Sequence, residues 1–75
     1  MAHRKIFERT GKTFTVKLFF DKDRYNFRIR TYWKGTKTVH SAYYNGEATR
    51  EQMERKAVRD LAYYEQAFKI NNGQA

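Results

Sequence analysis

Two arginines stand two residues apart in the stretch RYNFRIRTYWKG, residues 24–35. At this spacing Arg28 and Arg30 would point to the same side of an extended chain. Asn26 and Tyr32 fall on that side too. Arginine carries a planar fork of donors that matches phosphate or guanine, and tyrosine can stack on a base. The alternative is an ordinary strand whose outer side is charged to prevent aggregation.

The charge of the chain favours an anionic partner. Its 75 residues include 16 Lys and Arg against 8 Asp and Glu, which gives a net charge of +8. Such a field attracts polyanions and speeds their binding. Nucleic acid is the first candidate, an anionic membrane surface the second and an acidic protein the third.

Catalytic and metal-binding patterns are missing from the sequence. There is no cysteine, so neither a thiol nucleophile nor a thiolate zinc site can form, and two histidines are too few for a histidine metal cage. The four glycines are scattered and form no phosphate-binding loop. Asp21 and Asp23 fall short of a cation site. We expect a protein that is not an enzyme and that uses no metal or cofactor.

The sequence predicts no membrane span and no membrane binding, since the polar side of the helix in its second half mixes acids and bases, unlike the Lys/Arg-rich side of an interfacial helix. No apolar run approaches the roughly 20 residues of a membrane span. The N-terminal residues, MAHRKIFERTGK, lack the apolar core of a signal peptide. Together with the absence of cysteine, this leads us to expect a cytoplasmic protein.

The first half of the chain alternates apolar and polar residues as strands do. Strands are predicted for residues 14–20, 25–33 and about 36–44, with turns at 21–24 and at Lys34-Gly35. In the third strand the expected inward residues are Val39, Ser41 and Tyr43. Residues 1–12 allow two interpretations, a fourth strand at the edge of the sheet or a flexible basic arm.

The second half predicts one helix. Thr49 and Gln52 have the spacing of a capping box, and apolar residues then recur on one side up to Phe68. The helix should end near Ile70, followed by a loose tail over residues 71–75. Residues 1–75 would thus form a single small basic α+β domain, a three-stranded (or four-stranded) antiparallel meander packed on one C-terminal α-helix. The predicted core combines Phe14, Val16, Leu18, Tyr25, Phe27, Ile29, Trp33, Val39 and Tyr43 with Met53, Ala57, Val58, Leu61, Tyr64 and Phe68.

One side of this sheet would stay uncovered, and the three predicted strands place no acid on it. It would carry Lys17, Arg28, Arg30 and His40 among aromatic and hydroxyl side chains, while the acids lie in a turn and in the helix. This segregation of charge predicts a surface for nucleic acid. The residues expected to contact it are Arg4, Lys5, Lys17, Asn26, Arg28, Arg30, Tyr32, Lys34, Lys37 and His40.

The stretch YNFRIRTYWKGTKTVHSAYYNGEATREQMERKAV, with its order of hairpin, strand and capped helix, resembles a known group of DNA-binding domains. These are the arm-type binding domains of phage and transposon integrases, which are similar to plant AP2-type and methyl-CpG-binding domains. The resemblance covers residues 14–68 and is carried by element order and basic strands. It implies that the exposed face of the sheet lies in the major groove. No recombinase domain follows the helix, so we expect a small regulator or accessory factor of phage or mobile-element type.

The functional expectation is a non-enzymatic nucleic-acid-binding protein, with DNA favoured over RNA and duplex favoured over single strands. The alternative is a small inhibitor or adaptor that binds an acidic surface of a protein partner, such as a host nucleic-acid enzyme, with Tyr and Arg as the main contacts. The sequence leaves the oligomeric state open, with a monomer preferred.

Overall fold

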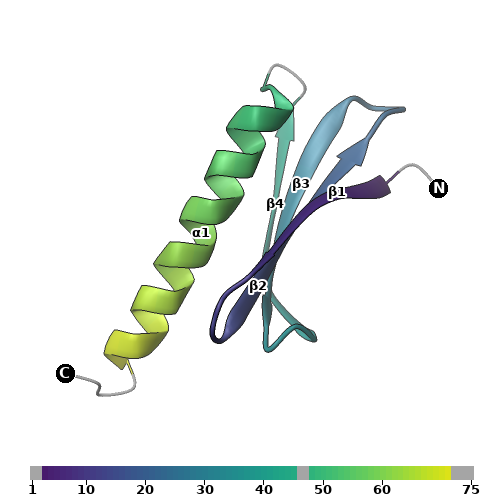
Figure 1. Cartoon of the computed structure of the whole chain (residues 1–75). Coiled ribbons are helices and arrows are strands. Elements are labelled where there is room, and N and C mark those ends of the chain that lie inside the picture. The colour runs from purple at the N-terminus through teal and green to yellow at the C-terminus, as the bar shows by residue number, and fades with distance from the viewer. Residues whose placement is uncertain (1–2, 46–47, 72–75) are drawn as a thin grey trace.

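The computed structural model of the chain describes residues 3–45 and 48–71, which form one antiparallel sheet and one helix (Figure 1). The strands lie in the order β1-β2-β3-β4. The elements are β1 (His3–Thr10), β2 (Phe14–Asp21), β3 (Asn26–Trp33), β4 (Lys37–Asn45) and α1 (Arg50–Asn71). The predicted α+β fold is confirmed, and the N-terminal segment is an edge strand rather than a flexible arm. Residues 72–75 of the predicted tail lie outside the described residues.

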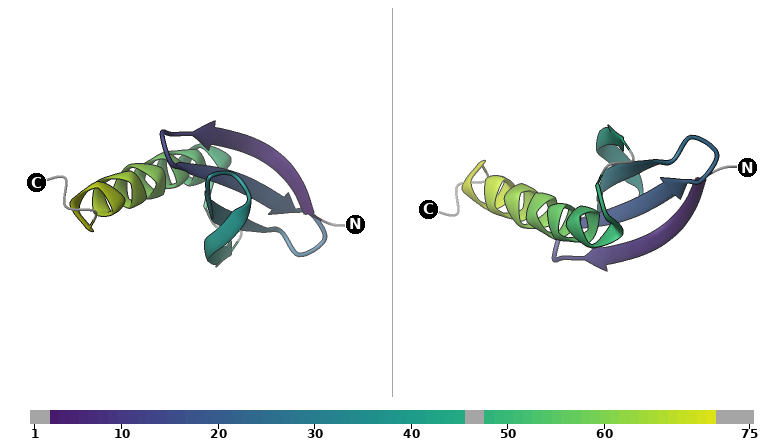
Figure 2. Two further views of the ribbon diagram at one scale, coloured as in Figure 1. Left: turned by 90° about the horizontal axis from the view of Figure 1, so that it is seen from below. Right: turned by 90° about the horizontal axis from the view of Figure 1, so that it is seen from above.

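The core lies between α1 and the middle of the sheet. Alternate residues of β2 and β3 are buried on one face, because successive side chains of a strand point to opposite sides. α1 packs along β2 and touches the flanking strands β1 and β3, while β1 and β4 lie at opposite margins of the sheet (Figure 2). The buried apolar residues are Phe14, Val16, Leu18, Phe27, Ile29, Met53, Ala57 and Leu61, all of them predicted.

A β-bulge reverses the predicted faces of β4. Thr31 lies opposite His40 and Tyr32 opposite Thr38, so Val39 is an extra residue without a partner on β3. One additional residue moves every later side chain of a strand to the other face. The prediction that Val39, Ser41 and Tyr43 point inward is therefore wrong, and all three are exposed.

The inward residues of β4 are those that lie opposite the core residues of β3. Ala42 pairs with Ile29, and Tyr44 pairs with Phe27 and packs against the core. The prediction for Tyr25 is also wrong. This residue lies in the turn before β3, with φ 51° and 60% of its surface exposed.

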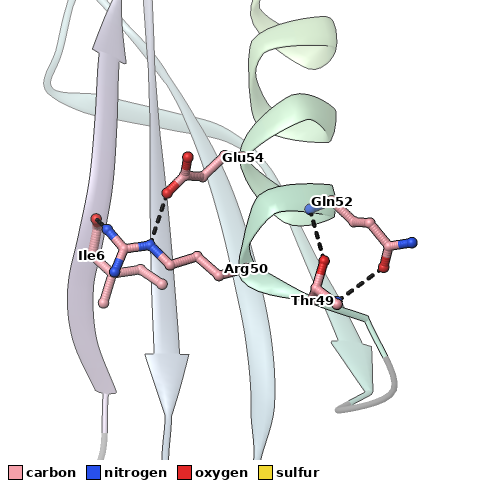
Figure 3. A network of polar contacts seen from close by, with 5 residues as sticks. All are labelled: Ile6, Thr49, Arg50, Gln52 and Glu54. Carbon is pink, nitrogen blue, oxygen red and sulfur yellow. Dashed lines mark hydrogen bonds and ion pairs between the residues drawn. The ribbon is translucent and has the colours of Figure 1, made fainter.

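The predicted turn and cap residues act as expected. Lys34 and Gly35 take φ values of 53° and 78°, and Thr36 N donates to Trp33 O at 3.2 Å. Two successive positive φ angles are those of a type I′ hairpin turn. Thr49 and Gln52 form the capping box: Thr49 N donates to Gln52 Oε1 at 2.9 Å and Gln52 N donates to Thr49 Oγ1 at 3.1 Å (Figure 3).

A carboxylate of α1 completes the turn between β1 and β2. Thr13 N and Phe14 N both donate to Glu65 Oε2, each at 2.7 Å. The Glu65 carboxylate lies so close to Gly11 that a Cβ atom there would be 2.5 Å from Oε2. A side chain at position 11 would therefore displace the Glu65 carboxylate. Two charge-assisted hydrogen bonds join the helix to the hairpin.

The edge strand β1 is also joined to α1 by a side chain from the start of the helix. β1 has a bulge at Ile6, between the pairs Lys5–Phe19 and Phe7–Leu18. Arg50 Nη2 donates to Ile6 O at 2.8 Å, and Arg50 Nε pairs with Glu54 at 2.8 Å (Figure 3). The first turn of α1 thus occupies a backbone acceptor of this edge strand.

Replacing Glu65 should destabilise the domain. We expect Glu65→Ala to lower the free energy of unfolding by about 2 kcal/mol, because two backbone donors lose a charged acceptor. For a domain of this size that corresponds to a fall in Tm of about 8–16 °C. Glu51→Ala is the matched control, since Glu51 is exposed and pairs with Arg55 at 3.6 Å on the helix surface. Equal melting temperatures for the two variants would contradict the role assigned to Glu65.

Candidate nucleic-acid interface

The side of the sheet away from α1, called the open face below, carries polar, charged and aromatic side chains in rows across the strands. Residues paired between neighbouring strands point to the same side, so the register defines each row. The middle rows are Lys5–Phe19–Arg28–Tyr43 and Glu8–Lys17–Arg30–Ser41, followed by Thr10–Thr15–Tyr32–Thr38.

Arg28 lies at the centre of the open face between two aromatic rings. Its Cζ atom is 5.6 Å from the ring centroid of Phe19 and 5.2 Å from that of Tyr43. Its Nη1 atom donates to Tyr43 Oη at 3.1 Å. Cation–π contacts with both rings, each worth about 0.5–1 kcal/mol at an exposed site, favour this position of the guanidinium.

The next row adds two more cations. Lys17 Nζ lies 4.8 Å from the ring centroid of Tyr32, and Lys17 is paired in register with Arg30. Arg30 is half-buried, and its buried Nε atom has no hydrogen-bond partner among residues 3–45 and 48–71. Three long cations, Lys17, Arg28 and Arg30, thus lie on two adjacent strands.

The open face carries two acids, which the sequence did not place there. Glu8 lies opposite Lys17 and forms an ion pair with Lys5. The hydrogen bond from Lys5 is the main cause that lowers the pKa of the Glu8 carboxyl, with Lys17 adding to it. Asp21 is buried, and its Oδ1 accepts from the backbone N–H of Asp23 at 3.0 Å. The expected absence of acids therefore holds for β3 and β4 but not for β1 or for the end of β2.

The structure brings together six of the ten residues predicted to contact nucleic acid. Lys34 and Lys37 lie at the β3–β4 hairpin, and Arg4 is paired with Phe20, whose side chain belongs to the side of α1. The six on the open face are Lys5, Lys17, Asn26, Arg28, Arg30 and Tyr32.

His40 does not lie on the open face, so that part of the prediction is wrong. The bulge at Val39 turns it toward α1, where its ring is 6.0 Å from that of Tyr64. Tyr43, which was predicted to point toward the core, lies on the open face opposite Arg28. Only the register between β3 and β4 could have shown that Tyr43 points to the open face. From the sequence alone, the apolar Val39 suggested that Val39, Ser41 and Tyr43 all point toward the core.

Two other surfaces of the described residues carry cations: a patch of Arg55, Lys56 and Arg59 on α1, and the groove between β1 and α1. The groove between β1 and α1 mixes acids and bases, with Glu51 and Glu54 beside Arg9, Arg55 and Arg59. Within residues 3–45 and 48–71, no three His, Cys, Asp or Glu side chains gather into a metal-binding group. α1 is charged along its length, and the described part of the chain contains no helix able to cross a membrane.

Comparisons of this chain with known protein families, with curated proteins and with solved structures give no match. The interpretation of the open face therefore depends on its own geometry and charge.

The ion pair at the margin of the open face can be checked by titration. Lys5→Ala should raise the pKa of Glu8 toward its ordinary value, because the main interaction that stabilises the carboxylate is removed. The measurement is an NMR titration of the side-chain carboxyl. Lys34→Ala changes the net charge equally at the hairpin turn and should leave the pKa of Glu8 unchanged.

Proposed function

We propose that this chain is a non-enzymatic nucleic-acid-binding protein that uses the open face of its sheet. The observation that carries the proposal is the position of Arg28, held between Phe19 and Tyr43 and flanked in the next row by Lys17 and Arg30. Cations clustered on one face neutralise phosphates and release their counterions. A guanidinium fork also matches the edge of guanine in the major groove.

Duplex DNA is the proposed form of the ligand. Proteins that bind single strands stack unpaired bases on exposed aromatic rings. Here each ring on the open face already has a cation over it: Arg28 contacts Phe19 and Tyr43, and Lys17 contacts Tyr32. The rings therefore support the cations, which are left to reach phosphates and base edges.

The proposed role is that of a small regulator or accessory factor in the cytoplasm. The second candidate is an inhibitor or adaptor that binds an acidic surface of a protein partner. It is favoured by one specific observation, the exposed Tyr43 beside Arg28, since Tyr and Arg are the residues most often dominant in protein interfaces.

The double substitution Arg28→Gln with Arg30→Gln tests the proposed surface. Glutamine keeps part of the side-chain stem, so the fold should persist while the two charges are lost. We expect binding to duplex DNA to weaken at least about tenfold, and the slope of log K against log salt to fall by about 2 if both residues contact phosphates. Fluorescence anisotropy over a salt series measures both quantities.

The matched control is Arg55→Gln with Arg59→Gln, which removes the same charge from the surface of α1. This variant should retain nearly all of the affinity. If both pairs weaken binding equally, net charge rather than the open face governs binding, and the proposed site is wrong.

A comparison of probes separates the candidate ligands. Gel-shift titrations with duplex DNA, single-stranded DNA and RNA of equal length should show the tightest binding to duplex DNA. Tighter binding to single-stranded DNA would show that the rings stack on bases after all. Failure to bind any of the three at low salt would refute nucleic-acid binding and favour an acidic protein partner.

A further inference from the structure

The two edges of the sheet are protected to different degrees. β1 carries the charged residues Arg4, Lys5, Glu8 and Arg9, has a bulge at Ile6, and receives a hydrogen bond from Arg50. Charge, bulges and covering side chains are the usual devices by which an edge strand avoids pairing with another chain. β1 has all three.

β4 lacks most of this protection. Residues 38–44, TVHSAYY, contain no residue that is charged at pH 7, with histidine neutral. Among the described residues no strand lies on the outer side of β4, and α1 reaches it through long side chains, Tyr64 beside His40 and Lys56 over the ring of Tyr44. The bulge at Val39 is near the start of β4, and from His40 to Asn45 the strand is in unbroken register with β3. Val39 and Tyr43 are 42% and 61% exposed.

We propose that β4 pairs antiparallel with β4 of a second copy of this chain, forming a two-fold dimer with one continuous eight-stranded sheet. The unpaired N–H and C=O groups of an edge strand are the template for such pairing. A net charge of +8 opposes self-association, and this repulsion is weakest at a surface that carries no charged side chain. β4 provides that surface, and pairing it with itself opposes no like charges over residues 38–44.

The symmetry restricts the register. A two-fold axis perpendicular to the sheet keeps both open faces on one side and sets one residue opposite its own copy. We place the axis at Ala42, the smallest side chain of the segment. Ser41 then lies opposite Tyr43 of the second copy, and His40 lies opposite Tyr44 of the second copy. β3 and its copy would be three strand spacings apart, about 14 Å, which joins the two sets of arginines into one surface.

Sedimentation velocity without nucleic acid tests the dimer, and so its outcome is independent of the proposed function. The wild-type chain should show the mass of two copies, with dissociation on dilution. Ser41→Lys places two like charges close to the axis and should raise the dissociation constant of the dimer at least tenfold. Thr10→Lys adds the same charge to the open face at the other edge, on β1, and should leave the dimer intact.

A cysteine cross-link provides a second measurement. It tests the β4–β4 dimer even if Ser41→Lys fails to fold. Because the chain has no cysteine, Ala42→Cys can form a disulfide only with another copy. Mild oxidation should link Ala42→Cys in high yield and Thr10→Cys hardly at all. The proposal is overturned if wild type stays monomeric up to about 1 mM, where even weak association is populated. Equal effects of the two lysine variants, or equal cross-linking of the two cysteine variants, would also overturn it.

Discussion

One helix has to cover a sheet of four strands, and this mismatch in width shapes the rest of the molecule. A helix with its side chains is about 10 Å across, whereas four strands extend over three spacings of about 4.8 Å. α1 packs along β2, so the core is centred there and β4 lies beyond the backbone of the helix. Long side chains bridge the remaining distance: Tyr64 meets His40, and Lys56 lies over the ring of Tyr44.

The aromatic residues serve two separate purposes on the two sides of the sheet. Toward α1, the ring of Phe14 packs against those of Tyr64 and Phe68, which adds buried area to a domain too small for a large aliphatic core. On the open face, Phe19 and Tyr43 stand beside Arg28 and restrict its rotamers. An arginine ordered in advance loses less conformational entropy when it meets a ligand, so such rings strengthen binding without contacting the ligand themselves.

Local patterns in the sequence predicted most of the fold, because the periods of strand and helix are visible in single segments. The alternation from Phe14 to Phe20 identified the buried face of β2, and the capping box marked the start of α1. β4 was assigned the wrong phase, since a strand has a period of two and one unpaired residue, Val39, exchanges its faces. Nothing in its local sequence distinguishes a bulge from regular pairing.

The sequence predicted some residues of the candidate site and missed others. Arg28 and Arg30 could be placed from β3 alone, because Phe27 and Ile29, which alternate with them along the strand, are clearly apolar. Tyr43 was missed, and the acid Glu8 was not expected on this face, because each depends on which residue lies opposite it on the next strand. The contact of Glu65 with the first turn could not be foreseen either, because it joins segments more than 50 positions apart.

That long separation has a consequence for the way the chain acquires its structure. The β1–β2 hairpin precedes α1 in the chain, yet the acceptor for the amides of Thr13 and Phe14 lies far along α1. Without α1 those amides have no carboxylate acceptor and the apolar face of the sheet has no cover. The hairpin therefore gains its full set of hydrogen bonds only when α1 docks, so part of its stabilisation depends on a non-local closure.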